Sequence, residues 1–389
     1  MNSPLLGGMP LATFLSEYWQ KQPLLIRNAI PNVSSPIDAN TLAGLACEEG
    51  IESRLIVHDE STGDWQLKHG PLDEQVFSVL PENHWTLLVQ AVDHWFPQAT
   101  EFLQLFNFIP QWRIDDLMIS YATDGGGVGP HFDNYDVFLV QTGGQRRWEV
   151  GELCNESTPL MENVPINMLK NFQAQHSWLL EPGDMLYLPP GYAHNGVAQG
   201  DDCITCSVGF RAPSHSEILQ SYTDYLDERL TETTRYTDAD LVPQENPGEI
   251  TSTAFKKIQD ILHGYVADEA NIREWFGRYI TQPKYLSEDS NYDENDLADA
   301  RAQLDKHLAG DGLLGRNESS RFAFQALEPL HHLFVDGIPY HQYGASNELI
   351  EILCENTSFN RETLPLSENN VALLVVLLVR EALYLYEPE

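Results

Sequence analysis

Short predicted strands fill the segment between Trp112 and Arg211, and this segment constrains the fold more than any other part of the chain. The strands are expected at 112–121, 131–141, 146–150, 178–181, 185–188 and 203–211, with glycine or proline between them. Thr142-Gly143-Gly144-Gln145 is expected to be a hairpin turn that joins the second strand to the third. Strands this short and this closely spaced favour an antiparallel sandwich or barrel, inside which positions far apart in the sequence can meet.

The segments on both sides of this β-rich region predict helices mixed with strands. Before it, apolar spacing predicts helices at 11–20, after residue 38 and across 84–108, and strands at 23–27, 53–58 and 65–69. After it, residues 214–230 and 251–280 are expected to be mostly helical.

The last hundred residues follow an acidic linker at 287–296 and resemble a winged-helix domain in the order of their elements. The expected elements are a helix at 295–308, strands at 321–328, 332–335 and 338–343, and helices at 346–355 and 369–382. We therefore predict three parts, at 1–213, 214–286 and 287–389.

The strongest candidate for chemistry is His131-Phe132-Asp133, which follows a glycine-rich loop at 124–129. Side chains two residues apart on a strand point to one face, so His131 and Asp133 can reach one ion together. The best third ligand is His194, in Pro189-Pro190-Gly191-Tyr192-Ala193-His194. Two histidines and one carboxylate, with other positions open, are the facial triad of non-haem Fe(II) oxygenases. A histidine and an aspartate at this spacing are common by chance, so the specificity comes from the combination.

Arg146 suggests a second ligand beside the metal. On its strand it shares a face with Trp148 and Val150, and a buried guanidinium among apolar neighbours needs a partner. That partner could be a protein carboxylate, or the far carboxylate of an α-keto acid bound to the metal. The hydroxyl of Ser120 could donate to the same carboxylate.

Strand parity also predicts a wall that faces a substrate. If Ser120 points into the interior, Asp116 on the same strand does so too, and Thr205 and Ser207 could line the same space. A carboxylate and hydroxyls suit a guanidinium or imidazole side chain. Tyr135, in phase with His131, could flank the substrate. Asp116 could equally be a solvated strand end, and Tyr135 a core residue.

The charge of the chain narrows the class of partner. It has 22 Lys and Arg against 58 Asp and Glu, a formal net charge of −36. Such a surface repels nucleic acid and anionic membranes and suits a basic partner, although acidity also serves solubility. Residues 288–389 hold 6 basic and 19 acidic residues, so direct reading of nucleic acid is not expected.

Cysteine usage and hydropathy predict a cytoplasmic protein. Five cysteines without a regular framework favour a reducing compartment. Cys203 and Cys206 would face opposite sides of a strand, which disfavours both a zinc site and a disulfide. No signal peptide is recognised, and the apolar run at 371–379 is too short to span a bilayer.

Several stretches carry a resemblance to a known family. They are Trp112 to Ser120, Gly125 to Phe138, Arg146-Arg147-Trp148, Glu181-Pro182-Gly183-Asp184, Pro189-Pro190-Gly191 and Ser207 to Pro213. In them the chain resembles the JmjC-type 2-oxoglutarate oxygenases, and among these the bacterial ribosomal oxygenases. The resemblance implies a mainly β fold with α: a double-stranded β-helix barrel of the cupin type, then a helical dimerisation region at 214–286 and a winged-helix-like domain at 287–389.

The same resemblance implies an activity and the residues that serve it. Fe(II) would be held by His131, Asp133 and His194, and 2-oxoglutarate by Arg146 and Ser120, with O2 as the other cosubstrate. The expected reaction is 3-hydroxylation of an arginine in a basic protein of the large ribosomal subunit, carried out by a homodimer.

Three alternatives remain open on the sequence. Eukaryotic relatives hydroxylate histidines of ribosomal proteins, so the target side chain could be a histidine. A cupin-type metalloenzyme could use another metal or substrate without 2-oxoglutarate. A ribosome-assembly protein could keep the barrel without turnover, although the intact triad argues against this.

Overall fold

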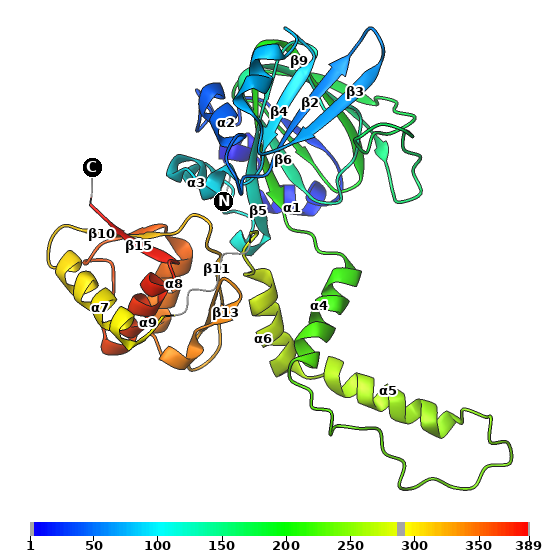
Figure 1. The fold of residues 1–389 in the computed structure, drawn as a ribbon, viewed down its shortest axis with the longest axis vertical. Coiled ribbons are helices and arrows are strands. Elements are labelled where there is room, and N and C mark those ends of the chain that lie inside the picture. Colours follow the sequence, from blue (N-terminus) through cyan, green and yellow to red (C-terminus); the bar gives the residue numbers. More distant parts are fainter. Residues whose placement is uncertain (1–3, 286–291, 388–389) are drawn as a thin grey trace. The chain divides into compact units, whose positions relative to one another are not determined.

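A nine-stranded antiparallel sheet organises the first of two units into which the chain divides, Met1–Ala212 and Pro213–Glu389. The computed structural model describes residues 4–285 and 292–387. The sheet is curved (Figure 1), and its strand order is β1-β8-β6-β9-β5-β4-β2-β3, with β7 paired to β6. The strands are β1 (Leu24–Ile26), β2 (Ser53–Asp59), β3 (Asp64–His69), β4 (Trp85–Val89), β5 (Ile114–Ala122), β6 (Val137–Leu153), β7 (His176–Leu180), β8 (Met185–Leu188) and β9 (Tyr192–Phe210).

The long strands β6 and β9 form the centre of this sheet. They pair antiparallel from Val137 opposite Gly209 to Leu153 opposite Tyr192. Strand β5 pairs with the second half of β9, while β8 and β7 pair with the two halves of β6. Most of the segments expected to carry chemistry therefore lie on three neighbouring strands.

The two faces of the sheet have different surroundings because side chains alternate along each strand. One face, with Phe138, Val140 and Cys206, packs in the main apolar core. That core includes residues of the helices α1 (Leu11–Glu17), α2 (Ala39–Leu45) and α3 (Pro97–Gln104). The other face, called the inner face below, carries a smaller apolar cluster that includes Leu139 and Trp148. Polar side chains also lie on the inner face, and they form the candidate site.

The hairpin predicted at 142–145 is wrong. Strand β6 continues through these residues and pairs with β9 on both sides of them. The pairing register shifts between Gln141 and Gly143 and again before Gln145, and Gly144 has a φ of +54°. The glycines therefore form an irregularity within one strand, where the backbone bends without reversing. As a result Arg146 lies on the same strand as Gln141.

The helix predicted across 84–108 is wrong in its first half. Residues Trp85–Val89 form β4, whose last four side chains are buried on both faces of the strand. A strand buried on both faces shows no alternation of polar and apolar residues, so its apolar run resembled a helical pattern. The helical part is confined to α3 and to a 3-10 turn at Val92–His94. Other 3-10 helices lie at Pro4–Leu6, Glu74–Val79, Gln111–Arg113 and His341–Tyr343.

The second unit combines helices with two three-stranded sheets. Its helices are α4 (His215–Asp227), α5 (Ser252–Val266), α6 (Glu269–Ile280), α7 (Glu294–Leu308), α8 (Asn347–Glu355) and α9 (Glu368–Val379). The sheets have the orders β14-β10-β15 and β11-β12-β13. Their strands are β10 (Leu313–Arg316), β11 (Phe322–Gln325), β12 (His332–Val335), β13 (Ile338–Pro339), β14 (Ser358–Phe359) and β15 (Leu383–Tyr386). Strands β10, β14 and β15 were not predicted, and residues 287–291 of the expected linker lie outside the described residues.

Local sequence signals start these helices where the structure has them. Ser214 caps α4 and forms a capping box with Glu217, while Asp268 caps α6 and Ser367 caps α9. Helix α9 is apolar all round because it is the central element of the larger core of this unit. Among the described residues, no helix has the length and apolarity needed to cross a membrane.

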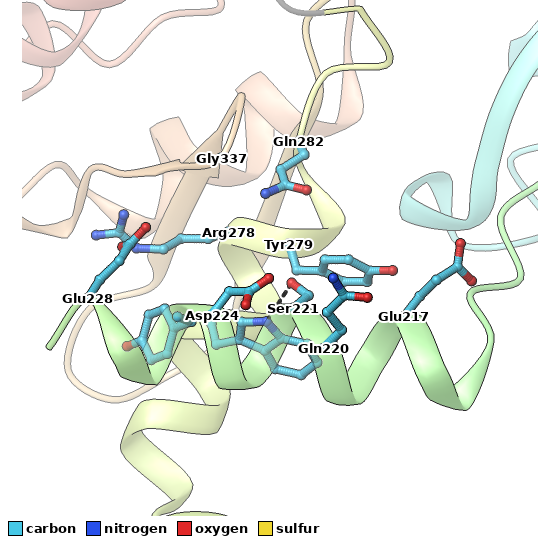
Figure 2. Close-up of a pocket in the computed structure, with 11 residues that line it drawn as sticks. Glu217, Gln220, Ser221, Asp224, Glu228, Arg278, Tyr279, Gln282 and Gly337 are labelled. Atoms are coloured by element: carbon cyan, nitrogen blue, oxygen red, sulfur yellow. Dashed lines mark hydrogen bonds between the residues drawn. The ribbon is translucent and has the colours of Figure 1, made fainter. Parts of the chain in front are cut away.

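A pocket of about 520 Å³ lies between α4, α6 and the turn at Gly337 (Figure 2). Its lining includes Trp275, the acidic side chains of Glu217 and Asp224 in α4, and that of Glu228, which directly follows α4. The Trp275 indole nitrogen donates to Ser221 Oγ at 3.0 Å, which ties α6 to α4. The pocket belongs wholly to the second unit, whereas the candidate metal ligands all belong to the first.

Candidate functional site

His131, Asp133 and His194 come together in the structure. Their potential ligand atoms all lie within 4.8 Å of one another, and no other group of three such side chains was found among the described residues. Asp133 Oδ2 lies 3.5 Å from His194 Nε2 and 3.9 Å from His131 Nε2. The backbones of the two histidines exchange hydrogen bonds of 2.8 and 2.9 Å, which fixes one beside the other. The geometry therefore suits one metal ion held by all three side chains.

The first two ligands do not lie on a regular strand, contrary to the prediction. His131 forms only an isolated bridge to His194, and β6 begins later, at Val137. The glycine-rich loop instead runs along β9, where Gly125 donates to the Ala198 carbonyl. A Cβ on Gly127 would lie 2.4 Å from the Gly196 carbonyl oxygen, so only glycine permits this approach. The loop thus delivers His131 to the strand that carries His194.

Both histidines present the same ring nitrogen to the cluster. His131 Nδ1 lies 2.9 Å from the Gly129 carbonyl, and His194 Nδ1 lies 2.9 Å from the Tyr192 carbonyl. A ring nitrogen that donates to a carbonyl leaves Nε2 as the atom with a free lone pair. Burial, together with the nearby His131, lowers the pKa of His194 to about 4, so its imidazole is neutral at pH 7. Neutral imidazoles oriented in this way are suited to bind a metal.

Arg146 is buried in the inner face with one guanidinium nitrogen unused. Its side chain is 4% exposed, and its Nε donates to Cys203 Sγ at 3.4 Å. The guanidinium carbon lies 5.8 Å from the centre of the Trp148 ring. One terminal nitrogen, Nη2, is buried with no hydrogen-bond partner, and Arg146 forms no ion pair with any acidic side chain in 4–285 or 292–387. The alternative of a protein carboxylate partner is therefore wrong, and the unused donor fits an anionic ligand.

Ser120 lies in a row of polar residues next to this arginine. It is opposite Thr205 on β9, and Thr205 is opposite Gln141 on β6. Thr205 Oγ1 donates to Gln141 Oε1 at 3.0 Å, and Gln141 Nε2 lies 3.4 Å from Cys203 Sγ. The predicted position of Thr205 on the inner face is therefore confirmed, but its hydroxyl is already bound to Gln141.

Asp116 and Ser207 share the inner face with Ser120, because Ser207 lies opposite Met118 between them. Asp116 is buried, not a solvated strand end. Its Oδ2 accepts from Gln90 Nε2 at 3.1 Å and from the Ala91 backbone at 2.9 Å. This carboxylate is therefore held in one orientation, which suits recognition of a donor group.

Tyr135 follows the first two residues of the metal cluster in the sequence, two positions after Asp133. Its side chain is 43% exposed, so it is not a core residue. Burial of its hydroxyl end raises the pKa of Tyr135 well above its usual range, and the negative charges of Asp133 and Asp116 raise it further. The hydroxyl thus remains protonated beside the Asp133 carboxylate.

Sequence reasoning missed several polar residues of the site. Cys203 is in phase with Thr205 and Ser207 on β9, so the parity that predicted those two could have found it. Gln141 was hidden by the hairpin prediction. Arg54 and Gln90 come from outside the β-rich segment: Arg54 donates to Gln90 Oε1 at 3.4 Å, and Gln90 holds Asp116. Nothing in the pattern of residues 53–90 assigned them to this sheet face.

Comparison with known proteins identifies relatives of the chain. A family model of the JmjC domain matches residues 101–218. The ribosomal protein uL16 3-hydroxylase of Escherichia coli K12 is 38% identical over 275 residues, which cover 70% of this chain and 71% of the relative. A probable ribosomal oxygenase of Haemophilus influenzae is 44% identical over 207 residues, covering 53% of this chain and 50% of the relative.

Solved structures agree with these relatives in fold. The X-ray structure of E. coli ycfD matches with a TM-score of 0.84 and 31% identity, covering 97% of this chain and 98% of that one. A structure of YcfD in complex with cobalt and 2-oxoglutarate matches with a TM-score of 0.81 at the same identity and coverage. The predicted JmjC or cupin-like fold is therefore confirmed as a mixed α/β fold built on an antiparallel sheet.

Proposed function

The chain belongs to the JmjC-domain family of ribosomal oxygenases, and from that premise we propose that it hydroxylates an arginine side chain in a protein of the large ribosomal subunit. It is a 2-oxoglutarate- and Fe(II)-dependent dioxygenase. The E. coli relative is named for 3-hydroxylation of ribosomal protein uL16, which makes uL16 the first substrate to test. A ribosomal substrate would place the reaction in the cytoplasm.

The observation that carries the site assignment is the pairing of a three-ligand cluster with an unused buried cation. His131, Asp133 and His194 offer two imidazole nitrogens and one carboxylate oxygen, the donor set of non-haem Fe(II) oxygenases. Arg146 offers a buried guanidinium nitrogen without a partner. A cupin-type enzyme that uses no 2-oxoglutarate would have no need for this charge, so the unused donor favours the oxygenase.

Each residue then has a defined task. His131, Asp133 and His194 would hold Fe(II), and Arg146 with Ser120 would fix the far carboxylate of 2-oxoglutarate. Together, Fe(II) and 2-oxoglutarate supply the chemistry that inserts one atom of O2 into a C–H bond and places the other in succinate as CO2 is released. The apolar cluster of the inner face, which includes Trp148 and Val150, would limit the access of water to the arginine side of this site.

The substrate wall favours a basic target side chain. Asp116 is held by Gln90 and the Ala91 backbone, and its charge, like that of Asp133, acts on the Tyr135 hydroxyl. A fixed carboxylate can accept two parallel hydrogen bonds from a guanidinium, while Ser207 adds a hydroxyl to the wall. An imidazole could also donate to Asp116, so histidine is the second candidate target.

We further propose that the second unit pairs two copies of the chain. Helix α5 has no buried residue, and it exposes Phe255, Ile258 and Leu262 along one side. An isolated helix of 15 residues is marginal in water, and it gains stability when such a stripe is buried. A second copy offers the same stripe, which makes a symmetric homodimer the simplest partner. In this proposal residues 1–213 catalyse, residues 214–286 dimerise, and residues 287–389 form a winged-helix-like domain.

The test is hydroxylation of purified uL16 or of its basic peptides with Fe(II), 2-oxoglutarate and O2. We expect the peptide mass to rise by one oxygen atom, succinate to form in step with it, and fragmentation to place the oxygen on an arginine. His131→Ala and Asp133→Ala should abolish both products, and Arg146→Gln should raise the KM for 2-oxoglutarate. Unchanged turnover in the first two variants would overturn the metal assignment, and oxygen on a histidine would replace the proposed target.

A further inference from the structure

The arginine that binds the cosubstrate is itself held by a thiol. Arg146 Nε donates to Cys203 Sγ at 3.4 Å, and Gln141 Nε2 lies 3.4 Å from the same sulfur. Cys203 is completely buried, and it is in phase with Thr205 on β9. Gln141 in turn accepts from Thr205 Oγ1 at 3.0 Å and approaches the Gly143 carbonyl with its amide nitrogen. The sulfur is thus one member of a chain of side-chain contacts that runs between β6 and β9.

The choice of a thiol has an electrostatic consequence. A carboxylate in this place would pair with the guanidinium and cancel its charge before any ligand arrived. A thiol accepts a hydrogen bond without carrying a formal charge. The other neighbour of the guanidinium, the Trp148 ring, is also uncharged. Arg146 therefore keeps its full positive charge, and its Nη2 edge remains unused.

We propose that Cys203 is the positioning residue for Arg146 and thereby sets the affinity for 2-oxoglutarate. By holding Nε, the sulfur fixes the guanidinium plane so that Nη2 faces the position of the cosubstrate's far carboxylate. Gln141 fixes the sulfur from its other side, and Thr205 fixes Gln141. This inference rests on the proposed role of Arg146 and extends it to the residues that orient it.

A purely structural role for a buried cysteine is the competing explanation, and the chain offers a matched control. Cys206 is on the same strand and is also completely buried, but it faces the main core. Its sulfur contacts Thr142 Oγ1 at 3.6 Å, whereas the sulfur that accepts from Arg146 is that of Cys203. If burial alone matters, the same substitution at either cysteine should have the same effect on cosubstrate binding.

The experiment compares Cys203→Val, Cys203→Ser and Cys206→Val in the full-length protein. Binding of 2-oxoglutarate is measured by calorimetry with Mn(II) in place of iron, so that no turnover interferes, and KM and kcat are then measured with Fe(II). Cys203→Val removes the acceptor and should weaken 2-oxoglutarate binding about tenfold, which is the typical effect of losing a hydrogen bond to a charged group. The KM should rise to the same extent, with kcat at saturating 2-oxoglutarate unchanged.

The controls separate this inference from the function on which it rests. Cys203→Ser keeps an acceptor and should restore most of the affinity, while Cys206→Val should bind 2-oxoglutarate as the wild type does. Equal losses in the two valine variants, or no loss in Cys203→Val, would overturn the role of Cys203. If Arg146→Gln also leaves 2-oxoglutarate binding intact, the cosubstrate assignment itself is wrong. Thermal unfolding of each variant identifies any that is misfolded, and Cys203→Ala then replaces Cys203→Val.

Discussion

At the scale of single residues, the site depends on glycines, because the absence of a side chain leaves room for a large neighbouring side chain. Gly196 lies opposite Trp148 on β6, and a Cβ there would lie 2.6 Å from the Trp148 ring. The ring in turn lies beside both Arg146 and His194. A glycine on β9 therefore determines where the indole packs between the metal cluster and the cosubstrate arginine.

We predict that Gly196→Ala destabilises the protein by about 1 to 3 kcal/mol, because the added methyl forces the Trp148 ring to move within a packed interior. The matched control is Gly44→Ala in α2, where an added Cβ meets no atom within 4 Å. That substitution should stabilise the protein by about 0.5 to 1 kcal/mol, since alanine favours a helix more than glycine does. Urea unfolding of both variants provides the measurement. A Gly196→Ala protein as stable as the wild type would show that the ring position is not constrained.

Metal binding gives a second prediction for single residues. A metal that binds only the folded state stabilises it by about 2.7 kcal/mol at a free concentration one hundred times its Kd. We expect Mn(II) to raise the Tm of the wild type and to leave that of Asp133→Ala unchanged, because the ligand oxygen is lost. Asp184→Ala is unsuitable as a control because Asp184 is bonded to Arg27 and Asn28. Asp201, which is exposed on β9, is a suitable control, and Asp201→Ala should keep the full Tm response.

At the scale of elements, the sequence predicted what depends on local pattern and failed where long-range pairing decides. The alternation within 112–121 predicted β5, the turns that flank 185–188 predicted β8, and parity on β5 and β9 placed Asp116, Ser120, Thr205 and Ser207 on one face. Pairing of β6 along the whole of β9 overrides the turn tendency of Gly143 and Gly144. The loop that carries His131 is likewise placed by its contacts with β9 and not by its own periodicity.

Residues that reach the site from strands distant in the sequence could not be predicted from local sequence patterns. Arg54 on β2 lies near the site because β2 pairs with β4 and β4 pairs with β5. The spacing of residues within 53–120 does not predict these pairings. The candidate metal ligands were predictable for a different reason, because the chemistry of an Fe(II) ion restricts the residue types that can bind it.

Helix α5 carries a prediction at the element scale. Leu262 is the most exposed residue of its apolar stripe, at 62%, so Leu262→Glu would place a charge within the proposed dimer contact. We expect this variant to be a monomer by light scattering at concentrations where the wild type is a dimer. Lys256→Glu changes a charge on another side of the same helix, where Lys256 pairs with Asp260 on the surface, and should remain dimeric. A dimeric Leu262→Glu protein would mean that the two copies, if paired, use another surface.

At the scale of the whole molecule, the net charge of −36 acts on the substrate and on the cosubstrate in different ways. A basic ribosomal peptide approaches from solvent, where the attraction between exposed charges is screened over about 10 Å at 0.1 M salt. In the proposed site the far carboxylate of 2-oxoglutarate pairs with the buried Arg146, and buried charge pairs are screened much less. The two KM values should therefore respond differently to salt.

We predict that raising NaCl from about 0.05 to 0.3 M increases the KM for a basic uL16 peptide severalfold, while the KM for 2-oxoglutarate changes little. The two constants are measured in the same assay, so the cosubstrate serves as an internal control for any general effect of salt on the enzyme. A peptide in which non-target Lys and Arg residues are replaced by Gln should lose most of the salt response, because the long-range attraction needs those charges. If the KM of the basic peptide is independent of salt, the acidity of the chain serves solubility or another partner and does not attract the substrate.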